Sequence, residues 1–123
     1  MSDDWLRDAY DRADGLDAAG WAALFEDAAP FTMGNSPAMV GPAQIEAGLA
    51  GFFDSISGMH HDFTNRVTVG NTEFVEAKVT YTRLDGSTVT IPGAAIVERN
   101  GSKISAARSY VDIMPLFATE VAQ

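Results

Sequence analysis

The spacing of apolar residues changes near Gly58, and this change constrains the fold more than any other feature of the chain. Before Gly58 the apolar residues recur at helical spacing, and after it they alternate with polar residues as they do in strands. Four strand-like runs follow: "HHDFTNRVTV", "TEFVEAKVTYTRL", "STVTIPGAAIVER" and "KISAARSYVDIMPLF". The separators "GN", "DGS" and "NGS" are typical of hairpin turns, because Gly and Asn tolerate positive φ. The sequence therefore predicts an α+β domain with helices on one face of a curved antiparallel sheet.

Three helices are predicted before the strands. The first covers residues 3–14, is capped by Ser2 or Asp3 and ends at Gly15; its apolar stripe is Trp5, Leu6, Ala9, Tyr10 and Ala13. The second begins at Asp17 and ends near Asp27. The third begins at Pro42, and its predicted buried face is Ile45, Leu49, Phe52, Phe53 and Ile56. Between them, "PFTMGNSPAMVGP" indicates a short strand followed by a loop.

Size and charge narrow the class of protein and its partners. With 123 residues the chain predicts a single domain, 1–123, with one core. Its net charge of −9 opposes binding to nucleic acid and to anionic membranes. The absence of cysteine excludes thiolate metal sites and disulfides and agrees with a cytoplasmic location. No metal site, organic cofactor, signal peptide or membrane span is expected.

Strand alternation predicts which residues line a pocket between the sheet and the helices. In "FVEAKVTYT" the apolar positions are Val75, Ala77, Val79 and Tyr81, so this face should point inward. In "RSYVD", Arg108, Tyr110 and Asp112 share one face of an extended chain. We interpret that face as the polar end of a largely apolar pocket; the alternative is a surface edge in which Asp112 pairs with Arg108 or Tyr110.

Several motifs together resemble the nuclear-transport-factor-2-like superfamily, and in particular its SnoaL-like, limonene-epoxide-hydrolase-like and ketosteroid-isomerase-like members. They are "LFEDAAPFTMGNSPAMVGPAQIEAGLAGFF", "MHHDF", "VTYTRLDGSTVTIPGAAIVERNGSKI" and "RSYVDIMPLF". The resemblance covers nearly the whole chain. It implies a cone-shaped domain of three helices on a strongly bent sheet, an apolar cavity, and a homodimer formed through the outer face of the sheet.

The resemblance also implies roles for single residues. Epoxide hydrolases of this type use an Arg and two carboxylates to activate a water that a Tyr and an Asn also hold. Asn35 matches the Asn and Asp112 matches one carboxylate, whereas Met33 stands at the tyrosine position. The Arg-x-Asp pair falls on Ala77 and Val79, or on Lys78 and Thr80, and neither register supplies it. Epoxide hydrolysis by that route is therefore not expected. In SnoaL-like cyclases the acid lies in the closing strand, and Asp112 matches that position.

The remaining candidates have a functional and a structural interpretation. One of His60 and His61 should face inward, either as a proton shuttle or bonded to backbone. Asn35 suits a turn or a ligand contact. Asp14 and Asp17 are interpreted as a helix cap and a surface acid. The residues predicted to contact substrate are Asn35, Tyr10, Trp21, Met33, Phe53, Val79, Tyr81 and Arg108.

The function predicted from these features is a small cofactor-independent SnoaL-like enzyme that isomerises or cyclises an apolar cyclic or polyketide-like substrate. Asp112 is the predicted acid/base, and Tyr110, His60 or His61 complete the predicted catalytic set. The alternative is a module of the same fold that binds a hydrophobic ligand, or another subunit, without chemistry.

Overall fold

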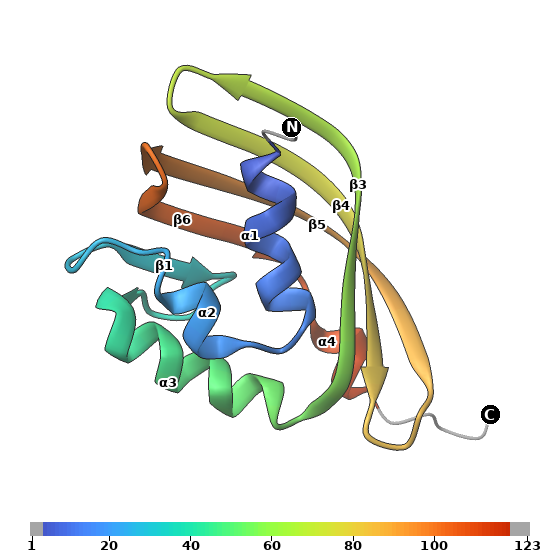
Figure 1. Cartoon of the computed structure of the whole chain (residues 1–123). Helices are drawn as coiled ribbons and strands as arrows, with labels where there is room; N and C mark the ends of the chain where they lie inside the picture. The colour runs from blue at the N-terminus through green and yellow to red at the C-terminus, as the bar shows by residue number, and fades with distance from the viewer. Residues whose placement is uncertain (1–3, 119–123) are drawn as a thin grey trace.

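A bent six-stranded sheet and four helices make up the part of the chain, residues 4–118, that the computed structural model describes (Figure 1). The helices are α1 (Trp5–Asp14), α2 (Ala18–Ala22), α3 (Gly41–Phe53) and α4 (Met114–Phe117). The strands are β1 (Pro30–Met33), β2 (Met39–Val40), β3 (Ile56–Val69), β4 (Thr72–Arg83), β5 (Thr88–Asn100) and β6 (Lys103–Val111).

The strand order across the sheet is β2-β1-β6-β5-β4-β3. Strands β3 to β6 form the predicted antiparallel meander, whereas β1 pairs parallel to β6 and antiparallel to β2. Figure 1 shows α1, α2 and α3 on the concave side of the sheet. The predicted α+β class is confirmed, and the apolar core lies between the helices and the concave face.

Local signals explain where α1 and α2 begin and end. Asp4 caps α1 by accepting a hydrogen bond from the Arg7 amide at 3.0 Å; the predicted caps Ser2 and Asp3 lie outside the described residues. Asp17 caps α2 through the Gly20 amide. α2 is shorter than predicted because the backbone on either side of Phe25 bonds instead to Ile104 of β6.

The third helix begins at Gly41, with Pro42 in its first turn, and it buries Ile45, Leu49 and Phe53 as predicted. Ile56 is buried as well, but it begins β3 rather than ending α3. The predicted hairpin turns are confirmed by Gly70, Gly86 and Gly101, which have φ of 58°, 90° and 62°.

Alternation on β4 is confirmed, because its odd-numbered residues from Glu73 to Tyr81 are buried and its even-numbered residues are exposed or partly exposed. β6 behaves differently. Ile104 pairs with Arg99 and Ala106 pairs with Glu98, so Ser105 is an extra residue in the β5–β6 ladder. This bulge reverses the faces of the strand: Ile104 and Ala107 are both buried although they are three positions apart. The bulge decides which β6 side chains reach the pocket.

Candidate functional site

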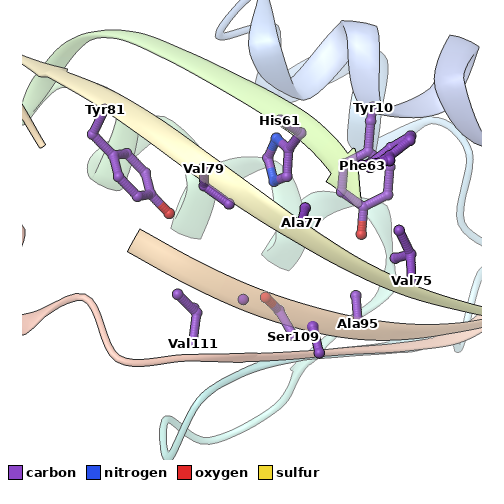
Figure 2. A pocket seen from close by; sticks show the side chains of 12 residues that line it. Tyr10, His61, Phe63, Val75, Ala77, Val79, Tyr81, Ala95, Ser109 and Val111 are labelled. Carbon is purple, nitrogen blue, oxygen red and sulfur yellow. The ribbon is translucent and has the colours of Figure 1, made fainter. Parts of the chain in front are cut away.

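Two small adjoining chambers lie between the helices and the concave face of the sheet. Their volumes are about 30 and 50 Å³. Four residues line both chambers: Tyr10, His61, Tyr81 and Ser109. Figure 2 shows these side chains converging on one space, with apolar residues of β4 and β5 around them. We call this space the inner pocket.

The period of β3 selects the histidine that enters the inner pocket. The His61 side chain is 15% exposed and lines both chambers, whereas the neighbouring His60 side chain is 70% exposed. The expectation that one histidine faces inward is therefore confirmed. The ring of Tyr10 packs edge-on against the His61 imidazole, with 4.7 Å between ring centroids.

Asp14, one helical turn after Tyr10, lies directly against His61. Its Oδ1 is 2.6 Å from His61 Nδ1, and its Oδ2 accepts the backbone N–H of His61 at 2.9 Å. Arg7 donates to the same Oδ2 at 2.8 Å and to the His61 carbonyl oxygen at 2.8 Å. The carboxylate therefore fixes both the backbone and the ring of His61, and Arg7 ties α1 to β3 at this point.

The environment of Asp14 favours its ionised form. Burial alone would raise the pKa of this carboxyl, but the hydrogen bonds from the His61 ring and backbone, together with the charges of His61 and Arg7, hold the pKa below its ordinary value of 3.8. An ionised Asp14 accepts the hydrogen on Nδ1, which leaves Nε2 as the ring nitrogen able to take a proton.

Hydroxyl groups supply the other polar atoms of the inner pocket. Burial raises the pKa of Tyr81 to about 12, and burial together with the Asp14 charge raises the pKa of Tyr10 further still. Both phenols therefore keep their hydrogen at neutral pH and can donate it to a ligand. The Nε1 atom of Trp21 is buried without a hydrogen-bond partner among the described residues, beside the second chamber. An apolar pocket with a few donors suits a compact molecule carrying an acceptor oxygen.

The predicted placement of the "RSYVD" face is wrong. Because of the bulge in β6, Ser109 and Val111 face the inner pocket, whereas Tyr110 is 54% exposed on the opposite face of the sheet. Arg108 forms an ion pair with Glu98 at 2.8 Å on that opposite face. Asp112 is exposed, and its Oδ1 accepts the Met114 amide at 3.0 Å ahead of α4. None of these three residues lines the inner pocket.

The other predicted contacts separate into two places. Tyr10, Trp21, Met33, Phe53, Val79 and Tyr81 line the inner pocket. Asn35 lies outside it with Asp112, in a hollow of about 360 Å³ on the edge of the domain. Met33 and Phe52 line both this hollow and the second chamber, so the two spaces adjoin.

Sequence reasoning misread Asp14 and passed over Arg7 and Ser109. Asp14 lies four residues after Tyr10, so both occupy the face of α1 that meets β3. The spacing of four residues is the sequence feature that places Asp14 on the same face of the helix as Tyr10. Asp17, by contrast, is the helix cap that the sequence predicts. Within residues 4–118, no three acidic or histidine side chains are placed to hold a metal ion, and no helix is long and apolar enough to cross a membrane.

Comparison with known proteins places this geometry in a family. The model of the SnoaL-like domain family matches residues 6–107, whereas no curated protein is significantly similar to the chain. A Catenulispora acidiphila protein with a ketosteroid-isomerase-like fold, in complex with trimethylamine, superposes with a TM-score of 0.79, 17% identity and coverage of 89% of this chain and 86% of that one. TerC, crystallised with polyporic acid, gives a TM-score of 0.77, 17% identity and 92% coverage of both chains. A candidate SnoaL-like polyketide cyclase from Jannaschia sp. CCS1 gives a TM-score of 0.72 and 16% identity, with coverage of 92% of this chain and 89% of that one. These TM-scores, at identities of 16–17%, show that the three structures have the same fold as this chain.

Proposed function

The chain belongs to the SnoaL-like domain family, and on that premise we propose that it is a cofactor-independent enzyme that transfers a proton on an apolar cyclic substrate. The product is an isomer of the substrate or a ring-closed form of it. His61 is the general base, Asp14 orients it, and the hydroxyl groups of the inner pocket bind the substrate oxygen.

The contact between Asp14 and His61 is the observation that carries this proposal. A 2.6 Å contact between a carboxylate and an imidazole, at the wall of a mostly apolar pocket, is the usual way to orient a catalytic base. The side chains of both residues are mostly buried, at 12% and 15% exposure. A purely structural pair would not need the His61 ring to line both chambers of a pocket.

The reaction follows from these roles. His61 Nε2 removes a proton from the carbon beside a substrate carbonyl, and the electron pair of the C–H bond moves into the enolate. A tyrosine hydroxyl donates a hydrogen bond to the enolate oxygen. If the substrate carries a C=C bond at its β,γ-carbons, the enolate is a conjugated dienolate. The imidazolium then returns the proton to the γ-carbon, which moves the double bond into conjugation with the carbonyl and completes an isomerisation. In a cyclisation the enolate carbon attacks a second carbonyl of the same molecule, and the imidazolium protonates the new alkoxide.

The adjacent histidines provide a matched test of this proposal. We expect the protein to exchange the α-hydrogens of 2-tetralone in D₂O, followed by NMR. His61→Gln should reduce this exchange by about 100-fold or more, the usual contribution of a general base. His60→Gln, which changes the same residue type at the neighbouring exposed position, should affect it far less, because His60 Nδ1 is 3.7 Å from Asp14 and the side chain is 70% exposed. Exchange at the wild-type rate in folded His61→Gln would refute the role of His61.

A second candidate function is a module that binds a hydrophobic ligand or another subunit without chemistry. The volumes of the two chambers, about 30 and 50 Å³, favour it because each admits only a few waters before side chains move. A ligand that raises the unfolding midpoint while no tested ketone exchanges its hydrogens would support binding without catalysis. No ligand binding at all would support the subunit-interaction role.

A further inference from the structure

The hollow next to the inner pocket has no role in the proton transfer itself. We call it the outer hollow; it is lined by the β1–β2 turn and by the end of β6. At about 360 Å³ it is several times larger than either chamber. Met33 and Phe52 belong to its wall and to the wall of the second chamber, and Val111 belongs to its wall and to that of the first. It therefore adjoins the inner pocket through three apolar side chains.

Backbone hydrogen bonds hold the walls of the outer hollow in place. The Gly34 amide donates to the Ser109 carbonyl oxygen at 2.8 Å, which holds the β1–β2 turn against β6. Ser36 closes the turn by donating its amide to the Met33 carbonyl oxygen at 3.0 Å. The turn and the strand end thus form two walls whose spacing is set by hydrogen bonds.

The outer hollow is lined by an acidic residue and by no basic one among the described residues. Asp112 is the one charged residue among the described residues that line it, and Asn35 and Ser36 add uncharged polar groups. The remaining lining is mostly apolar, from residues such as Met39 and Ile113. One Asp112 oxygen accepts a hydrogen bond from the Met114 amide, and the residue lines the hollow. Within residues 4–118, no basic side chain lines the hollow to receive an anion.

We propose that the outer hollow binds the part of a two-part substrate that extends beyond the inner pocket, and that it selects an apolar extension ending in a hydrogen-bond donor over one ending in an anion. This rests on the proposed function, since the compact head of the substrate occupies the inner pocket. The substrate is then larger than a single ring. Asp112 determines specificity for its far end and takes no part in the proton transfer.

Equilibrium binding tests this proposal independently of turnover. The probes are phenol, 4-phenylphenol, and two 4-phenylphenols with an aminomethyl or a carboxylate group at the far para position, all measured by calorimetry at pH 7. The wild-type protein should bind 4-phenylphenol about tenfold more tightly than phenol, because the second ring is buried in the outer hollow. The aminomethyl compound should bind about fivefold more tightly than the carboxylate, as a partly exposed charge contact allows.

The ratio of the affinity for the aminomethyl compound to that for the carboxylate compound is the quantity to compare between variants. Two substitutions that exchange Asp and Asn, which have side chains of similar size, should move this ratio in opposite directions. Asp112→Asn keeps an oxygen to accept the Met114 amide and removes the charge, so the aminomethyl-to-carboxylate ratio should fall to about one. Asn35→Asp adds a negative charge to the other wall of the same hollow, so the ratio should rise. Asp62→Asn removes an exposed charge from β3, the opposite edge strand of the sheet, and should leave the ratio at its wild-type value.

Equal affinity for phenol and 4-phenylphenol, or a ratio that Asp112→Asn leaves unchanged, would overturn the proposal. These outcomes differ from failure of the proposed function. A protein that binds the probes as expected, yet exchanges the hydrogens of no ketone, keeps the outer hollow as a subsite and loses the catalytic role of His61.

Discussion

Asp14 should make the stability of the protein depend on pH in the acid range. Its pKa in the folded protein lies below the ordinary value of 3.8 because His61 and Arg7 favour the ionised form. The stabilisation is therefore complete above about pH 4 and is lost as pH falls through the lower pKa of the folded state. In urea unfolding between pH 7 and pH 2.5, the free energy of unfolding of Asp14→Asn should fall less than that of the wild type.

The same substitution tests the strength of these contacts at pH 7. Asp14→Asn removes the ionised partner of the His61 ring and one of the two carboxylates that pair with Arg7, which keeps Asp11, so it should cost about 2 kcal/mol. Asp62→Asn, at an exposed position, should cost less than about 0.5 kcal/mol. An Asp14→Asn protein with the stability and acid sensitivity of the wild type would show that the pair contributes nothing to folding.

Tyr81 is the second single residue on which the proposed chemistry depends. Its pKa of about 12 keeps the phenol protonated, so the hydroxyl group can donate to an enolate oxygen throughout the neutral range. Tyr81→Phe should lower the rate of ketone hydrogen exchange by about 100-fold, as the loss of such a donor does elsewhere. Tyr110→Phe removes the same group from the exposed face and should leave the rate unchanged. Equal rates in both variants would exclude Tyr81 as the donor.

Single residues show where prediction from the sequence ends. The apolar stripe of α1 predicts which of its residues are buried. Tyr10 and Trp21 are predicted to contact ligand because each is an aromatic residue of the helix layer with a polar tip. The role of Asp14 depends on His61, 47 positions away, and no local spacing reveals that partner. A carboxylate near the end of a helix has the same local pattern whether it meets solvent or a histidine.

At the scale of elements, alternation predicted β4 correctly and β6 incorrectly, for a physical reason. β4 pairs without irregularity with β5 along its whole length, so its period of two is unbroken. β6 contains the extra residue Ser105, and the alternation that begins at Ile104 reverses after it. The position of a bulge depends on the pairing with the neighbouring strand, which the residues of β6 alone do not specify.

The attachment of α4 to the end of β4 can be tested by hydrogen exchange. Arg83 at the end of β4 donates to the carbonyl oxygens of Pro115 and Leu116 at 3.0 and 2.9 Å. Phe117 of the same helix contacts Phe52, which lies between the inner pocket and the outer hollow. Arg83→Met should therefore raise hydrogen exchange of residues 114–117 about fivefold, with β4 itself unaffected.

Lys103→Met is the matched control for this variant. Lys103 also donates to a backbone carbonyl oxygen, that of Ala23, but it begins β6, whereas α4 follows the other end of that strand. It should leave exchange in residues 114–117 at the wild-type rate. Faster exchange there in both variants would mean that α4 responds to general loss of stability and not to Arg83.

At the scale of the whole molecule, the outer face of the sheet, which points away from the helices, is unusually apolar for a surface. Phe74 is 42% exposed, and with Val67, Ile96 and Tyr110 it borders a shallow hollow of about 320 Å³. The same face carries both signs of charge, including Lys78 and Arg108 against Glu76 and Glu98. We propose that a second copy of the chain covers it, because opposite charges on one face can pair across a two-fold axis.

Light scattering after size-exclusion chromatography tests this dimer. The wild-type mass should be about twice the 13.1 kDa of one chain. Phe74→Glu places a charge in this apolar patch and should give a monomer, because the interface would bury an unpaired carboxylate from each of the two chains. Met114→Glu is the control, because it also replaces an exposed apolar residue with Glu. Met114 is 71% exposed on α4, away from the patch, so this variant should stay dimeric. A wild-type monomer at 100 µM would refute the proposal, and the site would then have to act within a single chain.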